Sequence, residues 1–266
     1  MVFGMFGFLL VFAIAGYLSF NPNPFNPGKA IGVKHEPGRI DKNTKPPVAG
    51  QNWTSPISGV EFVWIPALNM WMGKFEVTNE EYLKKEPTHD SRSIQTSTFS
   101  GDRQPVVYVS VDNARAYAAW LTTNEAAILS GYRYRLPRVT EWITIAQAGH
   151  DWLFPWGNEW PPTSGNAGNY HGQEASFVHD KIPGYHDNHP VTCNVEDSWE
   201  NPWHVFGLGG NVWEACLSDT DTSSFGAWMG ASWINSIPDR LHCTNSQLRE
   251  VGEPAMNFGF RLVLAR

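Results

Sequence analysis

The sequence predicts an α+β fold that is rich in loops, with few helices and short strands, preceded by one transmembrane helix. Two observations predict the loop-rich fold class. The 266 residues include 24 Gly and 19 Pro, and 14% are aromatic; turn formers beside large core residues are typical of a compact domain with many loops. A charge-free segment predicts the membrane helix. The chain therefore divides into a transmembrane helix (1–20), a tether (21–57) and a globular domain (58–266).

Residues 1–20 contain no charged side chain, and the first one in the chain is Lys29. Roughly 19 apolar residues at about 1.5 Å each give about 28 Å, enough to cross the hydrocarbon core of a bilayer. A cleaved signal peptide is the alternative, because Ala13-Ile14-Ala15 resembles a cleavage site, although no Lys or Arg opens the segment. We expect a single-pass anchor in a bacterial inner membrane, with the head in the periplasm.

The segment 21–57 is rich in Pro, Asn and Gly, as in NPNPFNPGK and NTKPPVAG. It shows no apolar periodicity, so both an extended spacer and a disordered linker fit it.

The charge of the chain limits its partners. Its formal net charge is -7, and its 19 basic residues are scattered. Because nucleic-acid binding requires a basic stripe or patch, the sequence argues against a nucleic-acid partner.

The globular part is expected to begin with a hairpin. The stretch GVEFVWIPALNMWMGKFEVT alternates apolar and polar residues around a turn near Asn69, which predicts two strands. The terminal stretch FGFRLVLAR predicts one final strand.

Three segments have helix signals. Thr78 and Glu81 have the spacing of a capping box before a short helix. Ser110 is the expected N-cap of the longest helix, whose apolar face is Ala114, Tyr117, Ala118 and Leu121. A third helix is expected from about Val139 to Ala148 and ends at Gly149.

Seven motifs follow one another along the chain: MGKFEVTNEEY, PVVYVSVDNARAYAAWL, YRLPRVTEWITIAQAG, FPWGNEW, FGLGGNVWEACLSD, GASW and NFGFRLV. Their order resembles that of the formylglycine-generating enzyme family, the sulfatase-modifying-factor domains of C-type-lectin-like fold. The resemblance covers residues 58–266. It implies the fold, whereas function depends on the residues of the site.

The resemblance implies two structural calcium sites. At the first, Gly210 and Val212 would offer carbonyl oxygens and Glu214 a carboxylate, ligands that suit a hard cation. The family often has a side-chain oxygen three residues before this glycine, where the present chain has Gly207. The alternative is that Trp213 is core and Glu214 binds local amides.

The second calcium site would lie near Asn169, Tyr170 and Tyr185, with Asp180 as its carboxylate.

Catalytic members of the family bind copper through two cysteines that follow the Gly-x-Ser-aromatic motif, because thiolates suit Cu(I). Counted from Ser232, those positions are Asn235 and Arg240. Cys243 is near but out of register, so no copper is expected. Cys193, Cys216 and Cys243 are compatible with one disulfide and one thiol, or with three buried thiols.

A loop rich in histidine, HDKIPGYHDNHP, contains His179, His186 and His189 with Asp180 and Asp187. Such side chains bind zinc or iron in some proteins, but the spacing is not diagnostic. A polar surface loop is the alternative.

The C-terminal loop is a candidate partner-binding surface, because aromatic and Arg side chains are enriched at interface centres. Its residues are Trp233, Ile237, Arg240, Leu241 and His242. The alternative is that Trp233 and Leu241 belong to the core.

An anchor joined to a head without copper ligands predicts a non-catalytic accessory subunit. The head would pack on a larger inner-membrane complex, such as a photosynthetic reaction centre or a respiratory complex, and residues 1–20 would lie in the bilayer. Two other functions stay open: a metal-dependent oxidase that uses the histidine loop, and a receptor head that binds a ligand through its C-terminal loop.

Overall fold

The computed structural model describes residues 40–162, 168–174, 180–219, 225–250 and 253–266. No helix within these ranges is long and apolar enough to cross a membrane. The predicted transmembrane helix, residues 1–20, lies outside the described residues, as does the tether up to residue 39.

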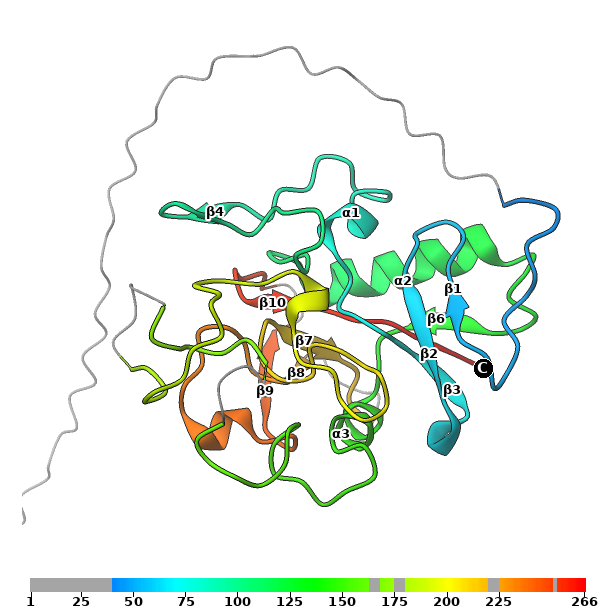
Figure 1. Ribbon diagram of the computed structural model, residues 1–266. Helices are drawn as coiled ribbons and strands as arrows, with labels where there is room; N and C mark the ends of the chain where they lie inside the picture. Colours follow the sequence, from blue (N-terminus) through cyan, green and yellow to red (C-terminus); the bar gives the residue numbers. More distant parts are fainter. Residues whose placement is uncertain (1–39, 163–167, 175–179, 220–224, 251–252) are drawn as a thin grey trace, which may run out of the picture. The chain divides into compact units, whose positions relative to one another are not determined.

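A five-stranded antiparallel sheet forms one half of the domain (Figure 1). Its strands, in spatial order, are β1 (Trp53–Thr54), β2 (Glu61–Ile65), β3 (Met70–Gly73), β11 (Val263–Ala265) and β6 (Arg133–Arg135). The predicted hairpin is confirmed: Asn69 adopts the left-handed conformation, with a φ of 49°, between β2 and β3. Because β1 pairs with β2, the sheet starts within residues 21–57, the range predicted as a tether.

A four-stranded sheet forms the other half. Its strands, in spatial order, are β10 (Phe258–Gly259), β7 (Trp213–Cys216), β8 (Phe225–Met229) and β9 (Ser246–Glu250). A separate short ribbon pairs β4 (Ser93–Ile94) with β5 (Ser97–Thr98). Single turns of 3-10 helix are η1 (Pro66–Leu68), η2 (Val195–Asp197) and η3 (Pro238–Leu241).

The prediction of one final strand over FGFRLVLAR is wrong. Its first residues form β10, which runs parallel to β7, and its last residues form β11 in the other sheet. Phe260, Arg261 and Leu262 cross from one sheet to the other and are fully buried. The apolar pattern is continuous because both strands are buried, so the pattern alone does not show the crossing.

All three predicted helices are present: α1 (Asn79–Tyr82), α2 (Val111–Glu125) and α3 (Val139–Ala146). Thr78 and Ser110 each form a capping box with the third residue of their helix, which satisfies backbone N–H groups that have no partner inside the helix. α3 ends two residues earlier than expected.

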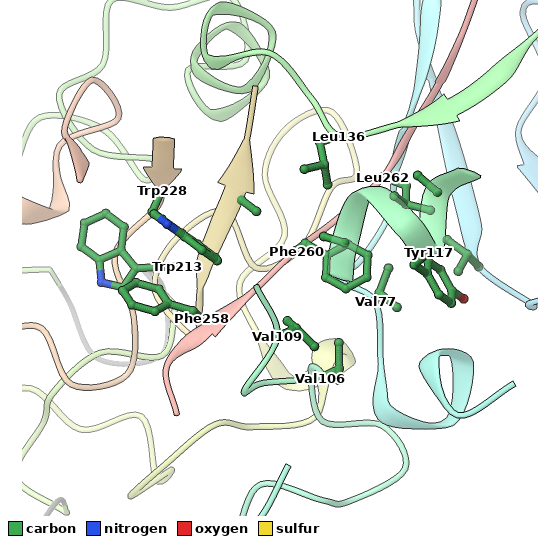
Figure 2. Packing of buried hydrophobic residues seen from close by; sticks show 14 of the residues in the cluster. Val77, Val106, Val109, Tyr117, Leu136, Trp213, Trp228, Phe258, Phe260 and Leu262 are labelled. Atoms are coloured by element: carbon green, nitrogen blue, oxygen red, sulfur yellow. The ribbon is translucent and has the colours of Figure 1, made fainter. Parts of the chain in front are cut away.

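The core lies between the two sheets and α2 (Figure 2). Tyr117 of α2 packs on Phe260 of the crossover, with ring centroids 5.6 Å apart. On the other sheet, Trp228 packs on Phe258 at 4.4 Å. The crossover segment is therefore fixed by packing on both sides.

Candidate functional site

The stretch FGLGGNVWE surrounds a buried ion pair. Glu214 on β7 accepts hydrogen bonds from Arg261, at 2.6 Å from Nε and 2.5 Å from Nη2. The indole Nε1 of Trp142 donates to the same carboxylate at 2.8 Å. All three side chains are fully buried, and a buried carboxylate in such a setting needs partners of this kind.

A second buried carboxyl group lies beside the pair. Oε2 of Glu76 is 3.8 Å from Arg261, and its Oε1 accepts a hydrogen bond from Asn211 at 3.0 Å. Burial raises the pKa of Glu76 to about 8; Arg261 lowers this pKa and the charge of Glu214 raises it. Near neutral pH, Glu76 is therefore mostly protonated, and one carboxylate balances one guanidinium.

Gly207 makes room for Glu76. Its φ is 71°, and a Cβ added there would lie 2.3 Å from Oε2 of Glu76. The carboxyl of Glu76 thus occupies the space into which a side chain at position 207 would project. By resemblance to the family, a side-chain oxygen was expected at position 207, where this chain has glycine. In the structure the carboxyl oxygen beside Gly207 comes from Glu76, which is distant in the sequence.

The other glycines and Asn211 join this stretch to the segment around Asn169. A Cβ at Gly210 would lie 2.0 Å from the carbonyl oxygen of Asn169, so only glycine permits this approach. Oδ1 of Asn211 accepts from the backbone N–H of Cys193 at 3.0 Å and from Asn169 at 3.2 Å. In the Gly-Gly-Asn sequence, glycine therefore lets the backbone approach that of Asn169, and Asn211 then forms hydrogen bonds with Cys193 and Asn169.

This geometry bears on the first predicted calcium site. Gly210 and Val212 lie beside Glu214 in one short segment, as expected, but both carboxylate oxygens of Glu214 face Arg261. A fixed guanidinium cation already neutralises this group. The three residues do not fit a calcium site in this arrangement.

The second predicted calcium site has a different set of oxygens. Asn169, Tyr170 and Tyr185 do come together, since the hydroxyl of Tyr185 donates to the carbonyl of Gly168 and the two tyrosine rings are 6.4 Å apart. The structure does not bring the carboxylate of Asp180 to them: its side chain is exposed, and its carbonyl oxygen lies 2.6 Å from Nδ1 of His171.

The carboxyl group at this place is that of Asp187. It accepts backbone hydrogen bonds from Tyr170 at 2.8 Å and from His189 at 2.9 Å. Burial raises the pKa of Asp187 to about 8, and the nearby carboxyl of Glu174 raises it as well. Both Glu174 oxygens are buried without a hydrogen-bond donor in the described part of the chain, and Oε2 lies 3.5 Å from His186.

Asp187 also lines a cavity of about 60 Å³, together with Asn169, His189, Asp197 and Ser198. Oδ1 of Asn169 and Oγ of Ser198 are buried and have no hydrogen-bond partner among the described residues. Buried oxygens without donors, next to carboxylates, match the all-oxygen ligand set of a hard cation. The residues at this second place therefore fit calcium.

Residues 44–266 match the family model described as "Sulfatase-modifying factor enzyme 1-like domain". The chain belongs to this family. The match begins before residue 58, in agreement with the early start of the sheet.

Curated relatives of the sulfatase-modifying-factor-like domain include inactive and active proteins. The chain is 30% identical over 164 residues to the "Inactive C-alpha-formylglycine-generating enzyme 2" of Bos taurus, covering 59% of this chain and 49% of the relative. It is 32% identical over 131 residues to the "Formylglycine-generating enzyme" of Thermomonospora curvata, covering 48% of this chain and 35% of that protein. The chain spans half or less of the length of these relatives.

Solved structures share the fold. PvdO from Pseudomonas aeruginosa has a TM-score of 0.55 and 20% identity, covering 74% of this chain and 80% of that one. Treponema denticola variable protein 1 has a TM-score of 0.58 and 16% identity, covering 81% and 99%.

Asn235 and Arg240 occupy the positions at which catalytic relatives are expected to have the copper-binding cysteines. Oδ1 of Asn235 accepts from the backbone N–H and hydroxyl of Ser232, at 2.9 and 2.8 Å. Arg240 lies exposed on η3. Cys243 is buried and unpaired, and burial raises the pKa of its thiol to about 12. These residues do not fit a copper site, because Asn235 and Arg240 offer no thiolate and Cys243 is a single free thiol whose neutral form is favoured by burial.

The histidine loop is only partly described. His179 lies outside the described residues, His186 is 56% exposed, and His189 contacts Asp187 through its backbone. Within the described ranges, no three His, Cys, Asp or Glu side chains gather as metal ligands.

The predicted partner-binding loop divides into two groups. Trp233 and Leu241 are buried, and Trp233 packs on Phe99 with centroids 5.7 Å apart, so the alternative of core residues holds for both. Ile237 is 46% exposed and Arg240 is exposed. His242 is half-buried against Phe154.

The sequence analysis did not identify four side chains of these sites. They are Glu76, Arg261, Glu174, and Asp187 in its role as a carboxylate of the second site. A signal existed for two of them. Glu76 stands between Phe75 and Val77, and Arg261 stands within an apolar run; a charged residue in such a context indicates a buried, paired charge.

Proposed function

We propose that this chain is a non-catalytic binding protein: an accessory subunit, anchored by residues 1–20, whose head packs on a larger membrane complex. The observation behind this proposal is the environment of Asn235. Its carboxamide is bonded to Ser232 at a position where copper-binding relatives are expected to have a thiolate.

The cysteines support the same proposal. All three are buried and free. Desolvation raises the pKa of each thiol, and a protonated thiol is a poor metal ligand and a poor nucleophile. The similarity to inactive relatives from Bos taurus and Mus musculus is in keeping with this interpretation.

The exposed residues Ile237 and Arg240 remain as candidate contacts. Arg240 lies on η3 and Ile237 directly precedes this turn, and an exposed apolar and a cationic side chain suit an interface. The partner would be a subunit of the membrane complex.

Purification of the full-length chain from native membranes in mild detergent tests the proposal. We expect one or more integral membrane proteins to migrate with it in fixed stoichiometry. A chain that migrates alone under conditions that preserve known complexes of the same membrane contradicts the proposal. Cu(I) titration against a chromogenic chelator adds a second test, since tight binding of one equivalent would restore the catalytic hypothesis.

We also infer a structural role for calcium at the cavity beside Asp187. Asn169 and Ser198 supply neutral oxygens, and Asp187 and Asp197 supply carboxylates. Calcium would neutralise Asp187, whose charged form is disfavoured by burial and by Glu174.

The second candidate function is a metal-dependent oxidase. It is favoured by one observation, the approach of His186 to the buried carboxyl of Glu174 at 3.5 Å. Metal analysis of the purified chain distinguishes the two functions: one equivalent of a redox metal, lost in a His186→Ala/His189→Ala variant, would support the oxidase.

A further inference from the structure

A groove of about 610 Å³ runs between helix α2 and strand β6, on a part of the domain not used by the sites above. The two elements lie side by side in Figure 1. Leu136 and Leu217 are among the residues that line it. A concavity of this size is in the range of ligand-binding pockets.

The groove is open because one stripe of α2 carries small side chains at four of its five positions, the exception being Arg115. Residues 115, 118, 119, 122 and 123 of α2 line it, and this spacing is that of one helix face. Ala118 is buried, whereas Ala119 and Thr123 are exposed. The alanines and threonines of this stripe leave space between helix and strand.

The edge of β6 is not available for an added strand. β6 is the last strand of its sheet, and such edges often accept an extended peptide through backbone hydrogen bonds. Here the hydroxyl of Thr122 accepts from the backbone N–H of Tyr134 at 2.9 Å and donates to its carbonyl at 3.4 Å. Any occupant of the groove must therefore be recognised by side chains.

All charged residues that line the groove are arginines, although the chain has a net charge of -7. Arg135 forms a two-bond ion pair with Glu141, at 2.7 Å for each bond. Arg115 is exposed, and among the described residues its ion-pair contact is a solvent-exposed one to Asp112 at 3.4 Å. Arg133 is exposed and has no ion-pair partner within the described part of the chain.

We propose that this groove binds an extended acidic segment of a partner protein, with Arg115 on the helix wall and Arg133 on the strand wall each holding a carboxylate. A guanidinium presents two parallel donors that match a carboxylate. Buried apolar residues such as Ala118 and Leu136 would receive an apolar side chain between the two acidic ones. The inference rests on the proposed binding function and names the chemistry of its partner.

The charge of the groove favours an acidic segment of a partner over the tether of the chain itself as the occupant. Residues 21–45 contain Lys29, Lys34, Arg39, Lys42 and Lys45 but only two acidic residues, Glu36 and Asp41. A segment with this balance is repelled by arginines. An anionic lipid has the right charge, and the experiment distinguishes it from a peptide.

Site-specific photo-crosslinking in native membranes tests the proposal with the full-length chain. A benzophenone side chain is placed at Ala119, which lines the groove, or at Ala116, which is also exposed on α2 but is not among the groove residues. We expect a crosslinked protein from position 119 and at least about tenfold less from position 116. The crosslinked peptide, sequenced by mass spectrometry, is expected to contain at least two acidic residues within about five positions.

A neutral or basic crosslinked peptide, an adduct that partitions with lipid, or equal yields at both positions would overturn the proposal. If a partner co-purifies in fixed stoichiometry but crosslinks at neither position, the groove proposal fails and the accessory-subunit proposal stands. If no partner co-purifies at all, the accessory-subunit proposal fails.

A binding measurement with a defined probe completes the test. The probe is a fluorescent octapeptide of alternating Glu and Leu, compared with the same peptide containing Gln in place of Glu. We expect an Arg115→Glu/Arg133→Glu variant to bind the acidic probe at least about tenfold more weakly than the wild type. Lys42→Glu, an exposed charge reversal outside the groove, is expected to change binding less than about twofold. Equal losses in both variants, or equal binding of the Gln peptide, would overturn the proposal.

Discussion

The guanidinium of Arg261 forms two hydrogen bonds to the carboxylate of Glu214, at 2.6 and 2.5 Å, in the interior of the domain. The same guanidinium donates to the backbone carbonyls of Gly73 at 3.0 Å and Phe206 at 2.7 Å. Gly73 ends a strand of the first sheet and Glu214 lies in the second. This one side chain therefore joins the two sheets at the crossover.

The first prediction concerns the carboxyl groups that face Arg261. Glu214→Gln removes the negative charge, and Glu76 then loses the repulsion that helps to raise its pKa. Glu76 can ionise in place of Glu214, so the single variant is expected to lose about 1–3 kcal/mol of unfolding free energy. The Glu76→Gln/Glu214→Gln variant leaves Arg261, which cannot lose its proton, without a carboxylate, and about 3–5 kcal/mol is expected.

Glu76→Gln alone replaces a group that is mostly protonated at neutral pH, so a loss of about 1 kcal/mol or less is expected. Urea unfolding of the three variants measures the coupling. Glu61→Gln, at a surface position, is the control. If the double variant loses no more unfolding free energy than the sum of the losses in the two single variants, Glu76 does not ionise in place of Glu214.

The second prediction is a fall in stability as pH rises. Glu76 and Asp187 have pKa values of about 8 in the folded chain, raised from ordinary values of 4.5 and 3.8. In the range between these values the folded state holds more protons than the unfolded state, so the unfolding free energy decreases with pH, by at most about 1.4 kcal/mol per pH unit for each group. The contribution is fully present below about pH 4 and is lost above about pH 8.

Thermal unfolding between pH 5 and 8 measures this effect, with Glu61→Gln as the control for an exposed carboxylate. Glu76→Gln is expected to have a shallower pH dependence than the wild type. An identical slope in both chains would show that Glu76 does not hold its proton through this range.

Local signals predicted the elements that depend on neighbouring residues. The capping boxes at Thr78 and Ser110 and the turn at Asn69 are formed by residues within a few positions of each other, and sequence spacing is sufficient to find them. The crossover at Arg261 was not predicted, because its direction depends on Glu214, which is 47 positions away.

The candidate sites follow the same rule. Asp180 and Asp187 stand in one loop, and their spacing does not distinguish them. The backbone N–H groups of Tyr170 and His189 hold Asp187 in place, and only the folded arrangement shows this. Similarly, the need for glycine at position 207 is explained by the carboxyl group of Glu76, which is more than a hundred positions away in the sequence.

The third prediction is that calcium stabilises the folded chain through Asp187. Calcium at about 100 times its dissociation constant is expected to add about 2.7 kcal/mol to the unfolding free energy. Asp187→Asn is expected to lose most of this gain, because the variant replaces the carboxylate that lines the cavity. Asp180→Asn, whose side chain is exposed, is the matched control.

The midpoint of thermal unfolding, recorded with calcium and with a chelator, provides the measurement. Equal calcium dependence in Asp187→Asn and the wild type would place the ion elsewhere. Binding of calcium is also expected to strengthen from pH 6 to 8, because Asp187 must lose its proton to become a ligand.

The last prediction separates steric overlap from backbone strain at Gly207. Gly207 and Gly131 both have positive φ, at 71° and 88°, so alanine at either position adopts a disfavoured backbone conformation and costs about 1–2 kcal/mol. At Gly131 nothing lies within 4 Å of an added Cβ, whereas at Gly207 the carboxyl of Glu76 lies within 2.3–2.5 Å. Gly207→Ala is therefore expected to cost at least about 1–3 kcal/mol more than Gly131→Ala, as overpacking does in a filled core. Urea unfolding of both variants gives the difference.

Because the shorter Asp withdraws the carboxyl group, Glu76→Asp is expected to recover part of the loss in Gly207→Ala and none of the loss in Gly131→Ala. If both glycine variants lose the same free energy, the space at position 207 is not filled by Glu76.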